Sequence, residues 1–216
     1  MARPRSLLSV VETAAQGKHG MTSTISDVRR ETADAPDGAR YTRTAQALHW
    51  LTLIAIAAIL PIAWVMTNLP AHDPRGGLLF SLHKSLGLTI WLLIAARLAW
   101  RFRHPAPALA PGTPSWMDWA GKANHWLMYL VFFAMPISGY VMAAMGKHGV
   151  QFWGVPLPSL PRVEWIDHLA DTGHSLGQWA VYALVLLHIA ATAWHVGWRR
   201  DGLLQRMLPP QTNAGA

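Results

Sequence analysis

The stretch from residue 172 to residue 198 reads TGHSLGQWAVYALVLLHIAATAWHVGW and carries His174 and His188 fourteen positions apart. It holds no Asp, Glu, Lys or Arg and exceeds the ~20 residues that a helix needs to cross a bilayer. At ~1.5 Å and ~100° per residue, the two imidazoles would lie ~21 Å apart along a helix and within ~40° of one direction. The stretch therefore predicts a membrane helix that presents two histidines on one face at two depths.

Three more apolar stretches precede it, at about residues 44–67, 78–100 and 123–145. Only 13% of the 216 residues are charged and twelve are tryptophan, whereas ordinary soluble domains hold ~25% charged residues. We therefore predict an all-α fold, an integral membrane four-helix bundle over residues 41–210. Residues 1–40 are polar and predict a disordered cytoplasmic tail, with Met21 as an alternative start, and 211–216 form a short C-terminal tail.

The basic residues predict the orientation of the bundle. They gather at the N-terminal flank, in the loop between the second and third stretches, and at the C-terminal flank, as Arg40, Arg43, Arg101, Arg103, Lys122, Arg199, Arg200 and Arg206. The positive-inside rule then places both termini in the cytoplasm and the first and third loops in the periplasm. The Lys and Arg residues cluster beside the apolar stretches, where they set the orientation of a membrane protein. The net charge of +7 therefore gives no reason to expect nucleic-acid binding.

The histidines within the stretches are the candidate cofactor ligands, since ionisable residues inside a bilayer are costly and indicate function. The absence of cysteine excludes thiolate-ligated or covalently attached haem and iron–sulfur clusters, so two non-covalent haems held by histidine pairs are predicted. His83 and His174 both lie near the periplasmic side and can face each other across one haem. His49, near the cytoplasmic side, needs either His188 or His195 as its partner. Spacing leaves both open, because these two are seven residues apart and share a helix face.

Other residues could support the cofactors. Arg97 and Arg101 are candidate partners of haem propionates, and His125 is either a packing residue or a contact to a quinone or a propionate. Lys84 could attract an anionic substrate, although a lysine at a helix end also commonly anchors the helix at the interface. Three glycines in the stretches would let helices or a flat macrocycle approach closely: Gly87, Gly139 and Gly177.

Several short motifs together resemble the bacterial cytochrome b561 family, the four-helix diheme membrane cytochromes that include superoxide oxidase. They are ALHW around His49, LHKSLGL around His83, HWLMYLVFFAMPISGY at 125–140, the spacing of the two histidines at 174 and 188, and WHVGWRRDGLLQRMLP at 194–209. Each motif is short, but their order and spacing over about residues 40–210 are specific. The family is related to the cytochrome b subunits of nickel–iron hydrogenases.

The resemblance implies a set of ligands and a function. It implies that His49 pairs with His188 on the cytoplasmic side and that His83 pairs with His174 on the periplasmic side. His195 would then not bind iron and would lie next to the ligands. It also implies a multi-pass protein of the bacterial inner membrane that transfers electrons between a periplasmic donor, in one form superoxide, and ubiquinone. The alternative is a haem-bearing anchor subunit of a dehydrogenase or hydrogenase complex.

Overall fold

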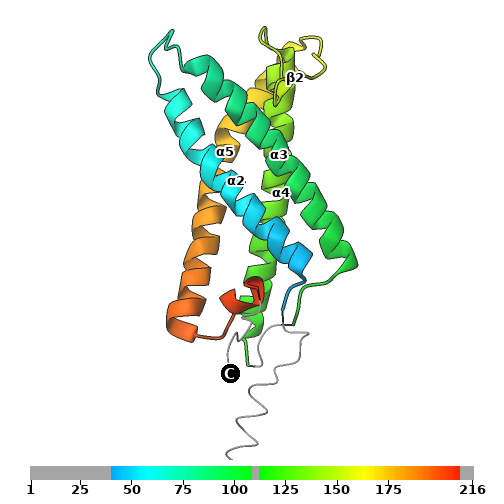
Figure 1. Cartoon of the computed structure of the whole chain (residues 1–216), viewed down its shortest axis with the longest axis vertical. Coiled ribbons are helices and arrows are strands. Elements are labelled where there is room, and N and C mark those ends of the chain that lie inside the picture. The colour runs from blue at the N-terminus through cyan, green and yellow to red at the C-terminus, as the bar shows by residue number, and fades with distance from the viewer. Residues whose placement is uncertain (1–39, 109–111, 210–216) are drawn as a thin grey trace, which may run out of the picture. The chain divides into compact units, whose positions relative to one another are not determined.

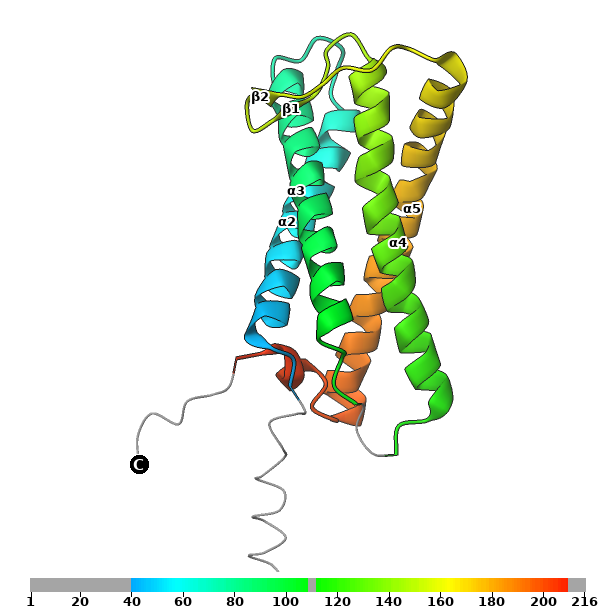
Figure 2. The ribbon, with the colours of Figure 1, turned by 90° about the vertical axis from the view of Figure 1, so that its right-hand side faces the viewer.

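The structure is a computed structural model that describes residues 40–108 and 112–209 (Figures 1 and 2). The predicted N-terminal tail, apart from Arg40, and the predicted C-terminal tail lie outside these residues. Residues 40–216 group into one compact unit, and every contact described below lies within it.

Four helices in the described ranges are long and apolar enough to cross a membrane, which confirms the predicted all-α membrane bundle. Their bounds are α2 Arg43–Thr67, α3 Gly76–Arg103, α4 Ser115–Met145 and α5 Glu164–Trp194. The helices alternate in direction, and α2 packs on α3, α3 on α4 and α4 on α5 (Figure 2). Proline is tolerated within α2 and α4, because in a membrane protein the neighbouring helices and side chains can satisfy the backbone groups that it frees.

Two helices begin earlier than the apolar runs predict. α4 begins at Ser115 and not at residue 123, and α5 begins at Glu164 and not at residue 172. The apolar run marks only the part of each helix that is long and apolar enough for the bilayer, and both helices have a polar first part before it. In α4 an Asp118–Lys122 ion pair of 2.7 Å joins successive turns, and the acidic first turn of α5 suits the positive end of the helix dipole.

One end of the bundle, called here the hairpin end, carries a small antiparallel hairpin of β1 (Gln151–Phe152) and β2 (Val155–Pro156). Trp153 and Gly154 at its tip have φ values of 48° and 88°, as a two-residue hairpin turn of the I′ type requires. The backbone N–H of Trp153 donates to the Ser85 hydroxyl on α3 at 3.1 Å. The turn-rich segment therefore packs on α3, as a cap over this end.

The opposite end, called here the tail end, holds both ends of the described chain (Figure 1). α5 continues as one π-helical turn, η2 (His195–Arg199), and a C-terminal strap of residues 200–208, with the 3₁₀ turn η3 (Leu204–Met207), then crosses to α2. Gln46, only 5% exposed, donates from Nε2 to carbonyl oxygens of the strap at 3.1 Å, and Trp50 Nε1 donates to another at 2.8 Å. These bonds tie the C-terminal segment to the first helix.

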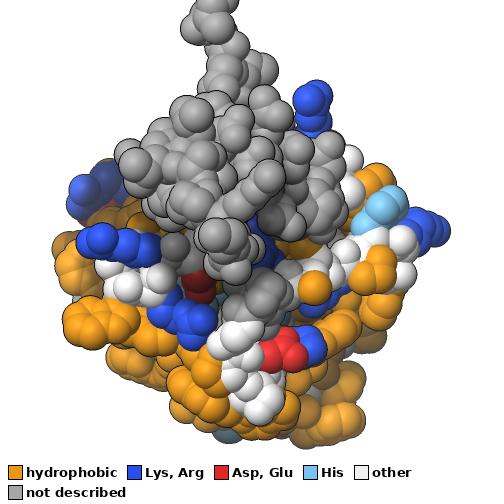
Figure 3. All heavy atoms as spheres, turned by 90° about the horizontal axis from the view of Figure 1, so that it is seen from below, with side chains coloured by type: hydrophobic (Ala, Val, Ile, Leu, Met, Phe, Trp, Pro, Cys, Tyr) orange, Lys and Arg blue, Asp and Glu red, His pale blue; other side chains and the backbone are white. Residues whose placement is uncertain are grey.

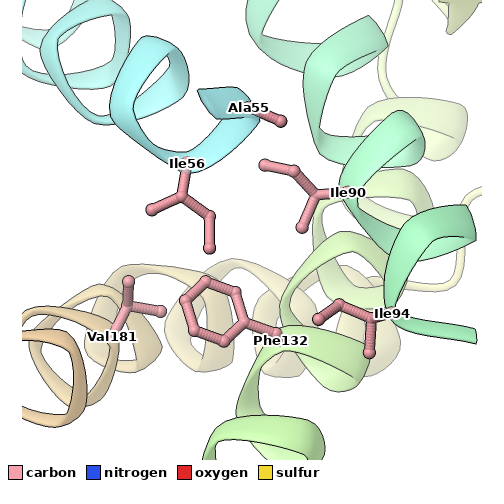
Figure 4. Close-up of a cluster of buried hydrophobic side chains, with 6 residues drawn as sticks. All are labelled: Ala55, Ile56, Ile90, Ile94, Phe132 and Val181. Atoms are coloured by element: carbon pink, nitrogen blue, oxygen red, sulfur yellow. The ribbon is translucent and has the colours of Figure 1, made fainter. Parts of the chain in front are cut away.

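An apolar cluster lies between the two ends and draws on all four helices: Ala55, Ile56, Ile90, Ile94, Phe132 and Val181 (Figure 4). The outward faces are apolar as well, with Trp64 and Leu186 each 69% exposed. Figure 3, which looks at the tail end, shows hydrophobic side chains around the sides and Lys and Arg side chains at the end. Exposed apolar faces with basic residues at one end are expected of a bundle in a bilayer.

Candidate functional site

Two pairs of histidines face each other inside the bundle. At the hairpin end, His83 of α3 and His174 of α5 have ring centroids 6.1 Å apart and are called the hairpin-end pair. At the tail end, His49 of α2 and His188 of α5 have ring centroids 6.2 Å apart and are called the tail-end pair. α5 thus contributes one histidine to each pair, as the spacing in the sequence predicts.

The separation within each pair suits a single metal ion between two imidazoles. A metal–imidazole bond is about 2 Å long and the ring centre lies about 1 Å beyond the nitrogen, so the centroids should be about 6 Å apart. In residues 40–108 and 112–209, no group of three or more His, Cys, Asp or Glu side chains could hold a bare metal ion. A metal here would need its other ligands from a cofactor, and haem, whose porphyrin supplies four nitrogens, meets that need.

The hairpin-end pair is held mainly from α4. His174 Nδ1 lies 3.0 Å from the Met135 carbonyl oxygen and 3.2 Å from the Ser138 hydroxyl. Gly139 permits this approach, because a Cβ built there would lie 2.9 Å from His174 Cε1. His83 Nδ1 is buried and has no hydrogen-bond partner among the described residues. One histidine of this pair is therefore fixed by a backbone acceptor and the other is not.

Two cavities of about 240 and 180 Å³ both have the hairpin-end pair in their walls. Gly87 lines both and would bring its own Cβ no nearer than 3.8 Å to any neighbour, so it leaves room beside the histidines. Gly177 serves helix packing instead, since a Cβ there would lie very close to the sulfur of Met135. Of the three predicted glycines, two therefore bear on the histidine site and one on the contact between α4 and α5.

The tail-end pair lies in a cavity of about 70 Å³ with Arg97 and His125 in its wall. Arg97 Nη2 lies 3.2 Å from His49 Nδ1. His125 packs with its ring centroid 5.3 Å from that of His188, and its Nδ1 donates to the Gly121 carbonyl at 2.6 Å. His125 therefore packs against a candidate ligand. This position agrees with both roles predicted for His125, a packing residue or a contact to a quinone or a propionate.

His195 lies elsewhere, outside the walls of that cavity. Its Nδ1 is 2.6 Å from Asp201 Oδ2, and Arg199 Nε reaches the same oxygen at 3.1 Å. Partial burial alone would raise the pKa of Asp201, but the hydrogen bond from His195 and the charge of Arg199 outweigh it and hold the pKa below its ordinary value. Of the two partners that spacing leaves open for His49, the structure brings His188 beside it and ties His195 to the strap.

The other predicted site residues lie near these pairs. Arg101 lines a small second cavity at the tail end together with Arg97 and His125. At the hairpin end, Lys84 Nζ donates to the Gly149 carbonyl at 2.9 Å and lines the larger cavity together with Lys147. Sequence reasoning missed this bond and the contacts of His174 with α4, because each joins segments far apart in the chain.

The carboxylates of the hairpin end do not reach the two cavities beside the hairpin-end pair. Neither cavity has an Asp or Glu in its wall. Asp73 forms an ion pair with Arg75 at 2.8 Å, and Asp167 one with Arg162 at 3.0 Å. The hydrogen bond from Arg75 lowers the pKa of Asp73 to about 2, so this loop carboxylate stays ionised and its charge is balanced by the neighbouring guanidinium.

Comparison with known proteins adds independent evidence. Residues 40–210 match a family described as prokaryotic cytochrome b561. Cytochrome b561 homolog 1 of Escherichia coli is 27% identical over 179 residues, which cover 79% of this chain and 97% of that protein. Cytochrome b561 homolog 2 of the same organism is 28% identical, with 78% and 91% covered, and the probable superoxide oxidase CybB of Yersinia pestis is 29% identical, with 75% and 92% covered.

Proposed function

This chain belongs to the prokaryotic cytochrome b561 family, and we propose that it carries two haems b and passes electrons from a periplasmic donor to ubiquinone. Family membership and the four membrane-crossing helices make it a membrane haem b electron-transfer protein of the bacterial inner membrane. The number of haems, their ligands, the donor and the acceptor are the proposal.

The two histidine pairs would hold the two haems. Haem iron supplies a carrier that takes up and releases one electron at a time. The protein positions the carriers: because His174 and His188 are fourteen positions apart, their irons would lie about 21 Å apart along α5. The apolar cluster around Phe132 fills the space between the pairs and keeps water out. Met135 and Gly139 orient His174, while Arg97 and Arg101 would meet the carboxylates of the tail-end haem.

The distribution of charge supports an orientation with the hairpin end in the periplasm. The tail end carries the basic residues of both chain flanks, of the last turn of α3 and of the first part of α4, and Figure 3 shows Lys and Arg side chains at this end. At the hairpin end, acids in the loop after α2 and in the first turn of α5 offset the cations, as the ion pairs of Asp73 and Asp167 illustrate. Basic segments stay in the cytoplasm, so electrons from a periplasmic donor would enter at the hairpin-end pair.

One observation favours superoxide as the donor: the larger hairpin-end cavity is walled by Lys84 and Lys147 and by no carboxylate. Positive potential in a cleft with low-dielectric walls raises the encounter rate of a small anion. A relative in Yersinia pestis is named a probable superoxide oxidase. In the proposed reaction each superoxide loses one electron and becomes dioxygen, and one ubiquinone takes up two such electrons and two protons to become ubiquinol.

The test is the rate at which superoxide reduces the oxidised, purified protein, followed at the haem absorption bands as a function of salt. We expect reduction faster than spontaneous dismutation, and a rate that falls as ionic strength rises. Lys84→Glu and Lys147→Glu should each lower the rate without loss of haem. Lys122→Glu, the same charge change at the opposite end, is the matched control and should leave the rate unchanged.

A rate no greater than spontaneous dismutation, with both haems present, would retire superoxide as the donor. The chain would then be read as a haem-bearing anchor subunit that receives electrons from a dehydrogenase or hydrogenase. If Lys122→Glu slowed the reaction as much as Lys84→Glu, superoxide would enter at the tail end or the charge effect would be non-specific. Either result would contradict the proposal that superoxide enters at the larger hairpin-end cavity.

A further inference from the structure

We propose that Arg97 makes the tail-end haem the higher-potential one, so that electrons run downhill from the hairpin-end pair to the tail-end pair. The inference rests on the proposed two-haem function. It concerns which haem holds the electron at equilibrium, and it follows from what lies beside His49 at the tail end and beside His174 at the hairpin end.

Arg97 touches a candidate ligand directly. Its guanidinium lies 3.2 Å from His49 Nδ1 and 5.8 Å from the centre of the Tyr129 ring. No ion pair joins it to a carboxylate among the described residues, and neither tail-end cavity that it lines has an Asp or Glu in its wall. Arginine keeps its proton in proteins, so the Arg97 guanidinium places a full positive charge beside the His49 ring, and no carboxylate of the described residues pairs with it.

The opposite arrangement is found at the hairpin end. An imidazole that binds iron through Nε2 carries its only proton on Nδ1. At His174 that proton can be donated to the Met135 carbonyl at 3.0 Å, which makes the ring a better electron donor to iron and favours the ferric state. At His49 the neighbouring group has only donors, so once Nδ1 carries the proton Arg97 can no longer hydrogen-bond to it. Arg97 would then act on the ring as a nearby positive charge and would not strengthen the ligand.

Charge acts in the same direction. Ferric haem carries one positive charge more than ferrous haem, so a guanidinium beside the ligand disfavours the ferric state and raises the reduction potential. Lys84 exerts a similar pull at the hairpin end, but its Nζ is bonded to the Gly149 carbonyl and not to a ligand ring. Arg97 lies beside a ligand ring and Lys84 does not, so we expect the larger effect from Arg97. Propionates that approach Arg97 would reduce that effect.

The resulting step moves a single electron and no bond or proton. One electron would pass from the haem held by the hairpin-end pair, which would be oxidised, to the haem held by the tail-end pair, which would be reduced. The electron is supplied by the periplasmic donor and is finally taken up by ubiquinone, both as in the proposed function. A downhill order of potentials would keep the entry haem oxidised and ready for the next donor molecule.

The test is a potentiometric titration of the purified two-haem protein, with the two ferric signals followed by electron paramagnetic resonance. The signals are assigned with His174→Ala and His49→Ala, each of which removes one ligand. In the wild type we expect the tail-end signal to disappear first on reduction. Arg97→Gln should lower the equilibrium constant for electron transfer to the tail-end haem about tenfold, equivalent to about 59 mV for a one-electron couple.

Two control variants separate this role from a merely structural one. Arg97→Lys keeps the charge and should restore most of the difference in potential, while Lys84→Gln should lower the hairpin-end potential instead. Earlier reduction of the hairpin-end haem in the wild type would overturn the inference, even if Arg97→Gln failed to bind haem. Unchanged potentials in a fully loaded Arg97→Gln protein would overturn it too. Fewer than two haems in the wild type would instead refute the proposed function.

Discussion

Replacement of Gly139 by alanine tests whether the hairpin-end pair depends on the close approach of α4 to His174. The added Cβ would lie 2.9 Å from His174 Cε1 and 3.1 Å from its Nδ1. Carbon atoms in ordinary contact are about 3.5–4.0 Å apart, so the ring must retreat by about 0.6 Å or more. Metal–ligand distances tolerate only about 0.2 Å, so His174 could no longer hold an iron at its present distance from His83.

We expect Gly139→Ala to weaken binding of the hairpin-end haem by about 10–100-fold, as loss of support behind a ligand typically does. Haem content per chain by the pyridine haemochrome method and transfer of haem to an apoprotein acceptor measure this effect. The matched control is Gly173→Ala, next to His174 in α5, where a Cβ would meet nothing within 4 Å. Both variants gain helix propensity, so only the clash distinguishes them. If both lose haem at the wild-type rate, the argument from close approach is refuted.

Three further predictions concern the ligands, the strap and the orientation. Alanine at either member of one histidine pair should remove one haem and spare the other, whereas His195→Ala should retain both haems by optical spectroscopy. Asp201→Asn should loosen the strap at neutral pH, as measured by hydrogen exchange. Because the pKa of Asp201 is lowered in the folded protein, its carboxylate stabilises the strap fully at pH values above the ordinary Asp pKa of about 3.9. This stabilisation is lost as the pH falls through the lowered pKa of Asp201. Equal exchange in both proteins at pH 7 would contradict this. Alkaline phosphatase should be active when fused after Val150 and inactive after Ala216; the reverse pattern would invert the bundle in the membrane.

Much of the architecture could be predicted because the bilayer imposes strict rules on sequence. Length and hydropathy were enough to find four helices, and the fourteen-residue spacing was enough to put His174 and His188 on one face of α5. The starts of α4 and α5 could not be found in this way. Hydropathy marks where a helix enters the membrane, whereas the polar turns before Lys122 and Thr172 are helical because of local pairs and the helix dipole.

The surroundings of the histidines depend on how separate helices align. His188 and His195 are two turns apart on one face, so local spacing could not choose between them as the neighbour of His49. The structure separates them because the chain turns back after η2 and brings Asp201 against His195. Likewise, the contact of Arg97 with His49 depends on the register of α3 against α2, which no short motif records.

We propose above that two histidine pairs hold two haems b without covalent attachment. The most direct measurement is the haem stoichiometry of the purified chain by pyridine haemochrome spectroscopy against amino-acid analysis, followed by extraction with acidified acetone. We expect two haems b per chain, both fully extracted. One haem per chain, no haem, or haem that resists extraction would contradict it.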